Sequence, residues 1–270
     1  MSGTATRTAT TRTPTARPAG FFRDLASVAG RALRGVTREP EAIVPALIIP
    51  IFFFAVNVGS LQEIAPAVGI SDYRAFQLPV AIIFAVTGVN RAQALQQDIA
   101  GGYFDRLLMA PVARSALLLG LLVADFVLVV ALSIPVLVLG ALLGIEYVTG
   151  VAGLVVFLLL AGAWGLAFNG FAYAIALRTG SAGAVGASFV LFFPFAFLTT
   201  TFVPEDALTG WLATVAAFNP VTYVLAALRS LISDGWDPVV LVGGAVAVAG
   251  VAAVSFTLCI LAMRGRIRRG

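Results

Sequence analysis

The sequence contains no lysine and no histidine, so all 17 of its basic residues are arginine. A phosphate-binding P-loop needs a lysine on the β- and γ-phosphates, and the chain therefore cannot itself be a standard P-loop ATPase. With Cys259 as its single cysteine, the chain also cannot form zinc sites from Cys and His, Ser-His-Asp or Cys-His catalytic groups, or an intrachain disulfide. We expect a non-catalytic protein with no metal and no cofactor of its own.

Charge is also scarce. Only 11% of the residues are charged, 60% are apolar and the mean hydropathy is +1.01, which indicates an integral membrane protein. Six apolar stretches are long enough to cross a hydrocarbon core of about 30 Å. They cover roughly residues 42–59, 76–95, 115–142, 150–177, 184–203 and 239–263. The sequence therefore predicts an all-α membrane fold with six transmembrane helices in a domain over 40–264.

The two ends of the chain are polar. Residues 1–20 are rich in Thr, Ala, Pro and Arg and lack an apolar run, which predicts a disordered cytoplasmic tail without a secretory signal. Residues 265–270 form a basic cytoplasmic tail. Between the first tail and the first span, residues 21–39 predict an interfacial amphipathic helix, since its arginines lie opposite one apolar arc. That arc includes Phe22, Leu25, Val28, Leu33 and Val36.

The region 204–238 decides the topology. Its apolar pieces, about 207–217 and 221–232, are each too short to cross, and Asn219-Pro220 separates them. We therefore predict an extracellular re-entrant hairpin over 204–232. If the protein lies in the plasma membrane with both termini on the cytoplasmic side, fifteen arginines face the cytoplasm and only Arg74 and Arg229 face outward, as the positive-inside bias requires.

The loop 96–114 is a charged, amphipathic island between two apolar runs. Its glycines permit a sharp turn, its proline ends a short helix, and an apolar ridge lies beside an acidic and a basic residue. These residues are Gly101, Gly102, Phe104, Asp105, Arg106, Leu107, Leu108 and Pro111. The pattern favours docking of a partner protein, and contact of the ridge with lipid is the alternative.

Two motifs resemble those of a known family, the type-2 ABC exporter permeases. The first is Asp98…Gly101-Gly102-Tyr103-Phe104-Asp105-Arg106-Leu107-Leu108-Met109-Ala110-Pro111-Val112-Ala113-Arg114, and the second is Asn219-Pro220-Val221-Thr222-Tyr223…Arg229. In the first motif Gly102-Tyr103-Phe104 replaces a commoner Gly-Thr-hydrophobic stretch, and this resembles the daunorubicin-resistance branch of actinobacteria. The second is similar to a segment of the family's extracellular hairpin.

The resemblance implies the transmembrane subunit of an ATP-driven exporter of amphipathic drugs or lipid-like molecules. It implies two permease copies, as a homodimer or a related heterodimer, and two copies of a separate P-loop ATPase that binds ATP and Mg. The loop 96–114 and the interfacial helix would contact that ATPase, with the loop contributing Asp98 and Arg114 as well as the residues named above. We expect no nucleic-acid partner.

Four further residues are candidates within the spans. Asp125 is a carboxylate deep in an apolar stretch, and pairing with Asn90 or Arg91 is favoured over binding of cargo or protons. Trp164, Asn169 and Tyr173 have roughly helical spacing and are candidates for a cargo path, although packing is the commoner role of such residues.

Three alternatives to the drug or lipid exporter stay open. A polysaccharide or teichoic-acid exporter of the same family would need a wide channel lined by aromatic residues. An ion-coupled secondary transporter would need several intramembrane ionisable groups and internal repeats. A structural membrane anchor would have no use for the charged loop.

Overall fold

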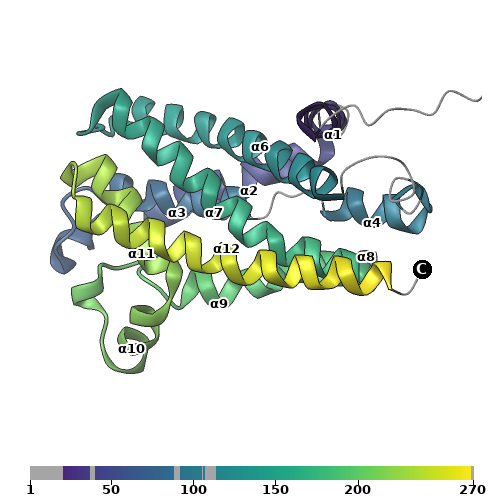
Figure 1. The fold of residues 1–270 in the computed structure, drawn as a ribbon. Coiled ribbons are helices and arrows are strands. Elements are labelled where there is room, and N and C mark those ends of the chain that lie inside the picture. Colours follow the sequence, from purple (N-terminus) through teal and green to yellow (C-terminus); the bar gives the residue numbers. More distant parts are fainter. Residues whose placement is uncertain (1–20, 37–39, 88–91, 105, 107–113, 269–270) are drawn as a thin grey trace, which may run out of the picture.

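The structure is a computed structural model that describes residues 21–36, 40–87, 92–104, 106 and 114–268 (Figure 1). Its long helices are α2 (Pro40–Leu61), α3 (Tyr73–Thr87), α6 (Arg114–Leu142), α7 (Gly150–Thr179) and α12 (Pro238–Ile267). Within the described ranges there is no strand, and five helical segments are long and apolar enough to cross a membrane. One of the five is the stretch Tyr73–Ala100, which contains α3 and α4 (Ala92–Ala100), with residues 88–91 outside the described part of the chain. The predicted all-α membrane fold is confirmed.

The fifth predicted span differs from the expectation. The chain forms α8 (Ala182–Ala187), the 3₁₀ turn η2 (Ser188–Leu191) and α9 (Phe192–Phe197), which together make 16 residues. At 1.5 Å per residue this helical stretch is about 24 Å long, shorter than the hydrocarbon core. The prediction of helix over 184–203 is wrong for residues 198–203, which are bent chain without helical structure.

The region after this stretch contains a broken helix pair. After the 3₁₀ turn η3 (Glu205–Ala207), α10 (Gly210–Phe218) and α11 (Pro220–Arg229) follow, and α11 continues into the π turn η4 (Ser230–Asp234). The two halves are bent by 82°. The predicted break at Asn219 is confirmed, and its reason is local: the Asn219 side chain caps α11 by accepting from the Val221 N–H at 3.0 Å, and Pro220 occupies the first turn.

Helix α3 lies at the centre of the bundle, with every residue from Gln77 to Ile83 buried. It packs on α2, α6, α7 and α11. Helices α7 and α12 lie side by side over much of their length, because a small residue allows close approach: a Cβ at Gly170 would lie 2.5 Å from the Ser255 hydroxyl. That hydroxyl donates to the Ala167 carbonyl at 2.6 Å.

Helix α1 (Phe21–Val36) covers one end of α6 (Figure 1). Its buried side chains are Ala29 and Ala32, and a Cβ at Gly120 of α6 would lie 2.7 Å from Cβ of Val28. The predicted helix over 21–39 is thus present to Val36, with 37–39 outside the described residues. Of its apolar arc, Leu25, Val28 and Leu33 are half-buried, and Val28 and Leu33 pack against the bundle. The position of the helix at the membrane surface stays a prediction.

Opposite ends of the bundle carry different elements. Helices α1, α4 and α8 and the C-terminal end of α12 lie at one end, and η1 (Ala65–Val68), η4 and the loop 143–149 lie at the other (Figure 1). We call these the α4 end and the hairpin end.

Candidate functional site

The loop motif predicted at 96–114 begins on α4 and turns at a glycine. Gly102 has φ +70°, a conformation that suits glycine, and its N–H donates to the Ile99 carbonyl at 3.1 Å. Gly101 donates to the Gln97 carbonyl at 2.9 Å. The sharp turn predicted at this pair is confirmed. Arg106 is exposed, and Arg114 begins α6.

Phe104 does not form part of an exposed ridge. It is buried against the bundle in a cluster with Leu95, Ile99 and Leu177. The physical reason is that the turn at Gly102 directs the chain back over α4, so that the aromatic ring can leave solvent. The other predicted members of the ridge, Leu107 and Leu108, together with Asp105 and Pro111, lie outside the described residues.

Arg31 links α1 to this segment. Its Nη2 lies 3.4 Å from Oδ2 of Asp98 on α4, and its guanidinium carbon lies 5.1 Å from the centre of the Tyr103 ring. On the other side of α4, Gln96 donates to the Gly180 carbonyl at the end of α7 at 2.9 Å. The α4 segment is therefore attached to both α1 and α7, and a displacement of it acts on both helices.

Asp125 is fully buried and connects α6 to α7. Tyr173 donates its hydroxyl hydrogen to Oδ2 of Asp125 at 2.7 Å, and Asn169 donates to the same oxygen at 3.3 Å. Two of the three residues predicted for a cargo path are thus partners of the acid. The expected partners Asn90 and Arg91 lie outside the described residues.

The third cargo-path residue, Trp164, is also fully buried and donates from its indole N–H to the Thr87 hydroxyl of α3 at 3.1 Å. Thr87 in turn donates to the Ile83 carbonyl at 2.6 Å. Contact of these side chains with cargo stays a prediction, because all of them already serve packing between α3, α6 and α7.

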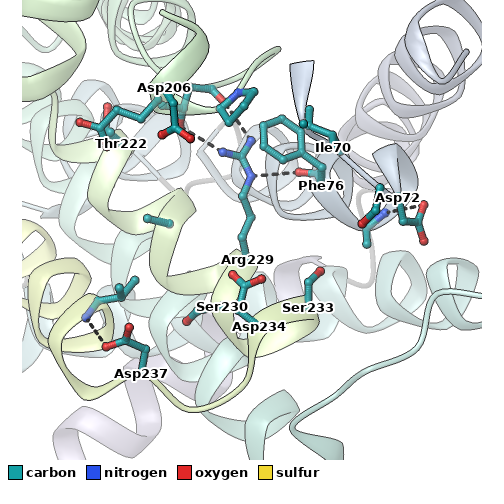
Figure 2. Close-up of a pocket in the computed structure, with 18 of the residues that line it drawn as sticks. Ile70, Asp72, Phe76, Asp206, Thr222, Arg229, Ser230, Ser233, Asp234 and Asp237 are labelled. Carbon is teal, nitrogen blue, oxygen red and sulfur yellow. Dashed lines mark hydrogen bonds between the residues drawn. The ribbon is translucent and has the colours of Figure 1, made fainter. Parts of the chain in front are cut away.

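At the hairpin end, Arg229 of α11 holds two other segments together. Its Nε donates to the Phe76 carbonyl of α3 at 3.1 Å, and its Nη1 and Nη2 donate to the hydroxyl and carbonyl oxygens of Thr200 at 3.1 and 2.8 Å. The guanidinium also lies 3.4 Å from the centre of the Phe76 ring, and Figure 2 shows it directed toward that residue.

Asn219, at the break between α10 and α11, also binds carbonyl groups of a neighbouring segment. While its oxygen caps α11, its Nδ2 donates to the Phe195 and Leu198 carbonyls at 2.8 and 2.7 Å, which are freed where α9 ends. Beside it, the hydroxyls of Thr199 and Thr222 are 2.6 Å apart, and Thr222 donates to the Ala216 carbonyl at 2.7 Å.

Two residues of α3 complete the arrangement. Gln77 donates to the Thr201 carbonyl at 2.8 Å and to the Tyr73 hydroxyl at 2.7 Å, and Tyr73 donates to the Phe202 carbonyl at 3.1 Å. We call Tyr73, Gln77, Asn219 and Arg229 the hairpin clamp. Irregular backbone at membrane depth needs partners for its carbonyls, and the hairpin clamp supplies them to residues 195–202.

Of the hairpin residues that the sequence singled out, Asn219 and Arg229 belong to the hairpin clamp and Pro220 starts α11. Tyr223 has a different position: it is 45% exposed and donates to the Ala217 carbonyl at 2.7 Å. Sequence reasoning missed Tyr73 and Gln77. The signal that could have found them is a polar pair four residues apart on one face of a helix whose other residues, apart from Arg74 and Thr87, are apolar.

A cavity of about 680 Å³ opens beside Arg229 at the hairpin end (Figure 2). Its wall carries six carboxylates and the single guanidinium of Arg229. The carboxylates belong to Asp72, Glu146, Glu205, Asp206, Asp234 and Asp237. Next to Glu146, burial raises the pKa of the Tyr147 phenol to about 12, so this residue stays neutral and donates to the Leu137 carbonyl.

These features define a class of protein: a multi-pass helical membrane protein with a broken helix pair at one end and a polar, amphipathic segment at the other. Comparison with known sequences gives the family. The chain belongs to the ABC-2 type transporter family, whose model matches residues 23–232. It is therefore the non-catalytic membrane subunit of an ABC transporter, and the family implies an ATPase partner.

Two relatives resemble the chain over most of its length. The daunorubicin resistance ABC transporter permease protein DrrB1 of Streptomyces coeruleorubidus is 27% identical over 213 residues, which cover 77% of this chain and 75% of the relative. The probable doxorubicin resistance ABC transporter permease protein DrrC of Mycobacterium tuberculosis is 25% identical over 207 residues, with 76% and 75% covered. The resemblance deduced from the two motifs is confirmed.

Proposed function

We propose that the chain exports amphipathic drugs or lipid-like molecules, driven by a separate P-loop ATPase that binds ATP and Mg. The names of the relatives support a drug as cargo, since they attach resistance to daunorubicin and doxorubicin to those proteins. The chain lacks the lysine of a P-loop, so hydrolysis is supplied by the partner. Two copies of this chain or of a related permease and two ATPase subunits complete the proposed transporter.

The observation that carries the proposal is the attachment of the α4 segment to α1 and α7. Arg31, Asp98 and Tyr103 join α4 to α1, and Arg106 remains exposed beside them. A partner that docks here contacts a segment already linked to two helices of the bundle. We therefore place the ATPase contact on the loop 96–114 and on α1.

Charge supports an orientation with both termini in the cytoplasm. The α4 end carries exposed arginines on α1, α7 and α12, whereas six carboxylates gather around the cavity at the hairpin end. Arginine-rich ends of membrane helices face the cytoplasm as a rule. The broken pair α10–α11 is then a re-entrant hairpin that enters and leaves on the outer side.

Copurification tests the docking site. The double change Arg106→Glu and Leu107→Asp should release the ATPase subunit during detergent purification while the permease stays folded. Arg178→Glu, which reverses another exposed arginine at the same end, is the matched control and should retain the subunit. Full retention by the double variant would contradict docking at this loop.

Cysteine labelling tests the orientation. In a Cys259→Ala background, single cysteines at Thr209 and Asp234, both exposed at the hairpin end, should react with an impermeant maleimide from outside intact cells. A cysteine at Arg268 should react only after the cells are opened. Labelling at position 268 in intact cells would mean that residues 204–238 cross the membrane.

A further inference from the structure

A second cavity, an open apolar groove of about 520 Å³, lies between α7, α9, the α10–α11 break and α12. We call it the aromatic groove. Its walls carry the aromatic rings of Phe168, Phe171, Phe195, Phe218 and Tyr223, together with the fully buried Trp164. The rings form an ordered set: Phe168 makes edge contacts to Phe171 and Phe195 with ring centres 5.5 and 5.9 Å apart.

Small residues of α12 form the opposite side of the aromatic groove. Gly243, Ala247 and Gly250 are spaced by four and three residues, so they share one helix face. A Cβ on Gly250 would meet nothing within 4 Å, and the nearest atom to a Cβ on Gly243 would be Cδ1 of Tyr223 at 3.8 Å. The groove therefore has aromatic rings on one side and small or branched aliphatic residues of α12 on the other, because Val246, Val251 and Val254 line it as well. This apolar lining suits a flat ring system.

The length of the aromatic groove suits a drug-sized molecule. The lining residues of α12 run from Gly243 to Val254, a distance of about 16 Å at 1.5 Å per residue. Its volume falls within the range of small-molecule sites, about 300–1,000 Å³. Phe218 at the helix break is 85% exposed, so the groove is open toward the apolar surface of the bundle, from which a lipid-soluble molecule can enter.

The acidic cavity at the hairpin end and the aromatic groove are lined by neighbouring residues of α11 and α12. Thr222 lines that cavity and Tyr223 lines the groove, and on α12 the corresponding neighbours are Val240 and Gly243. Three residues of helix separate these last two positions by about 4.5 Å. Six carboxylates line that cavity against the one guanidinium of Arg229, and Asp72 is paired with Arg74, so a ligand meets an excess of negative charge there (Figure 2).

We propose that the aromatic groove and the neighbouring acidic cavity form one binding site for an amphipathic cation, whose flat apolar rings lie in the groove and whose amine points to the carboxylates. This inference rests on the proposed export function and assigns its cargo a site within a single permease chain. Charge complementarity selects this occupant, because neither a lipid acyl chain nor the apolar face of a second copy would use the carboxylates.

Binding of daunorubicin to the full-length chain in lipid nanodiscs tests the site, with a derivative acylated on the amine as the neutral probe. Gly250→Leu puts an apolar side chain into the groove at a position where an added Cβ meets no atom within 4 Å. It should weaken binding of both probes by about tenfold or more, since apolar contact is lost. Gly59→Leu is the matched control, because Gly59 on α2 is also exposed with nothing within 4 Å of an added Cβ. It should bind both probes like the wild type.

The double change Glu205→Gln and Asp206→Asn tests the acidic part. Both side chains are exposed, and both substitutions preserve shape. Binding of daunorubicin should weaken by about threefold to tenfold, as for a screened charge contact, and binding of the neutral derivative should not change. An equal effect on both probes would overturn the role of the carboxylates.

Three other results would overturn the assignment of the aromatic groove as a binding site. These are wild-type affinity in Gly250→Leu, an equal loss in Gly59→Leu, or absence of daunorubicin binding to the wild type. Photocrosslinking from position 250 to a phospholipid that daunorubicin does not displace would assign the groove to a lipid chain. Nucleotide-driven transport by the wild-type complex separates the proposals: if Gly250→Leu still transports daunorubicin normally, export stands and the site fails, whereas a wild type without transport contradicts export itself.

Discussion

Replacement of Arg229 by methionine should destabilise the protein more than any other change to an arginine at the hairpin end. Methionine keeps an apolar stem of similar length but removes the donors to Phe76 and Thr200. A carbonyl that loses its donor away from water costs about 1–3 kcal/mol, and loss of the contact with the Phe76 ring adds about 1 kcal/mol. A total of about 3 kcal/mol corresponds to a lower melting temperature by about 6–12 °C for a chain of this size.

Arg74→Met is the matched control. Arg74 also lies at the hairpin end, donates to one carbonyl, that of Leu143, at 2.8 Å, and pairs with Asp72 at 3.4 Å. Both partners of the pair are about one-third exposed, so its loss should cost less than about 1 kcal/mol. Arg229→Lys should lie between the two variants, because one ammonium cannot span the acceptors on both sides of the guanidinium.

Cys259 provides the assay. It is the single cysteine of the chain and is buried in α12, so a thiol-reactive fluorophore reports unfolding in a heating experiment without any added label. The expected order of melting temperatures is wild type, Arg74→Met, Arg229→Lys and Arg229→Met, from highest to lowest. Equal melting temperatures for Arg74→Met and Arg229→Met would refute the hairpin clamp as a stabilising unit.

Two other predictions concern the spans. Tyr173→Phe should lower the free energy of unfolding by about 1–2 kcal/mol, because the buried Asp125 loses a hydrogen-bond donor. Asp125→Asn keeps an acceptor oxygen, so this variant should fold and export both cationic and neutral cargo. Selective loss of export of cationic cargo by a folded Asp125→Asn protein would show a cargo role instead. Gly120→Val should detach α1 from α6 at a cost of about 1–3 kcal/mol, which would be measured as faster proteolysis within α1. Gly30→Val is the control and should not speed proteolysis, because an added Cβ at Gly30 meets no atom within 4 Å. Equal proteolysis of the two variants would contradict the close contact between α1 and α6.

The long spans could be predicted from the sequence because apolar length alone determines them in a membrane. The fifth predicted span is the exception. Residues 198–203 contain three threonines that are only mildly polar, so hydropathy extends the span through them. The helix nevertheless ends at Phe197, because Asn219, Gln77 and Arg229 supply donors to the carbonyls of the bent chain. Those donors come from residues 21 to 124 positions away in the sequence, and no local sequence pattern indicates such a match.

Part of the candidate site could also be predicted from the sequence. The motifs located Asn219, Arg229 and the α4 loop, since residue type and spacing identify them. The burial of Phe104 and the pairing of Arg31 with Asp98 depend on how α1 and α4 pack in three dimensions. The same holds for Asn169 and Tyr173, which helical spacing placed on one face of α7 but which only the packing of α6 against α7 brings to Asp125.

The two ends of the bundle differ in how strongly their elements are joined, and this difference has a mechanical consequence. At the α4 end, Arg31 holds α1 to α4 by an exposed ion pair and a ring contact, worth about 1 kcal/mol, so these two helices can shift relative to each other at little cost. At the hairpin end, the carbonyls of residues 195–202 depend on the hairpin clamp, whose disruption at Arg229 alone costs about 3 kcal/mol. A force applied at the α4 end should therefore first change the position of α1 relative to α4. The hairpin should follow together with α3, because Phe76 and Gln77 of α3 are among the residues that hold it.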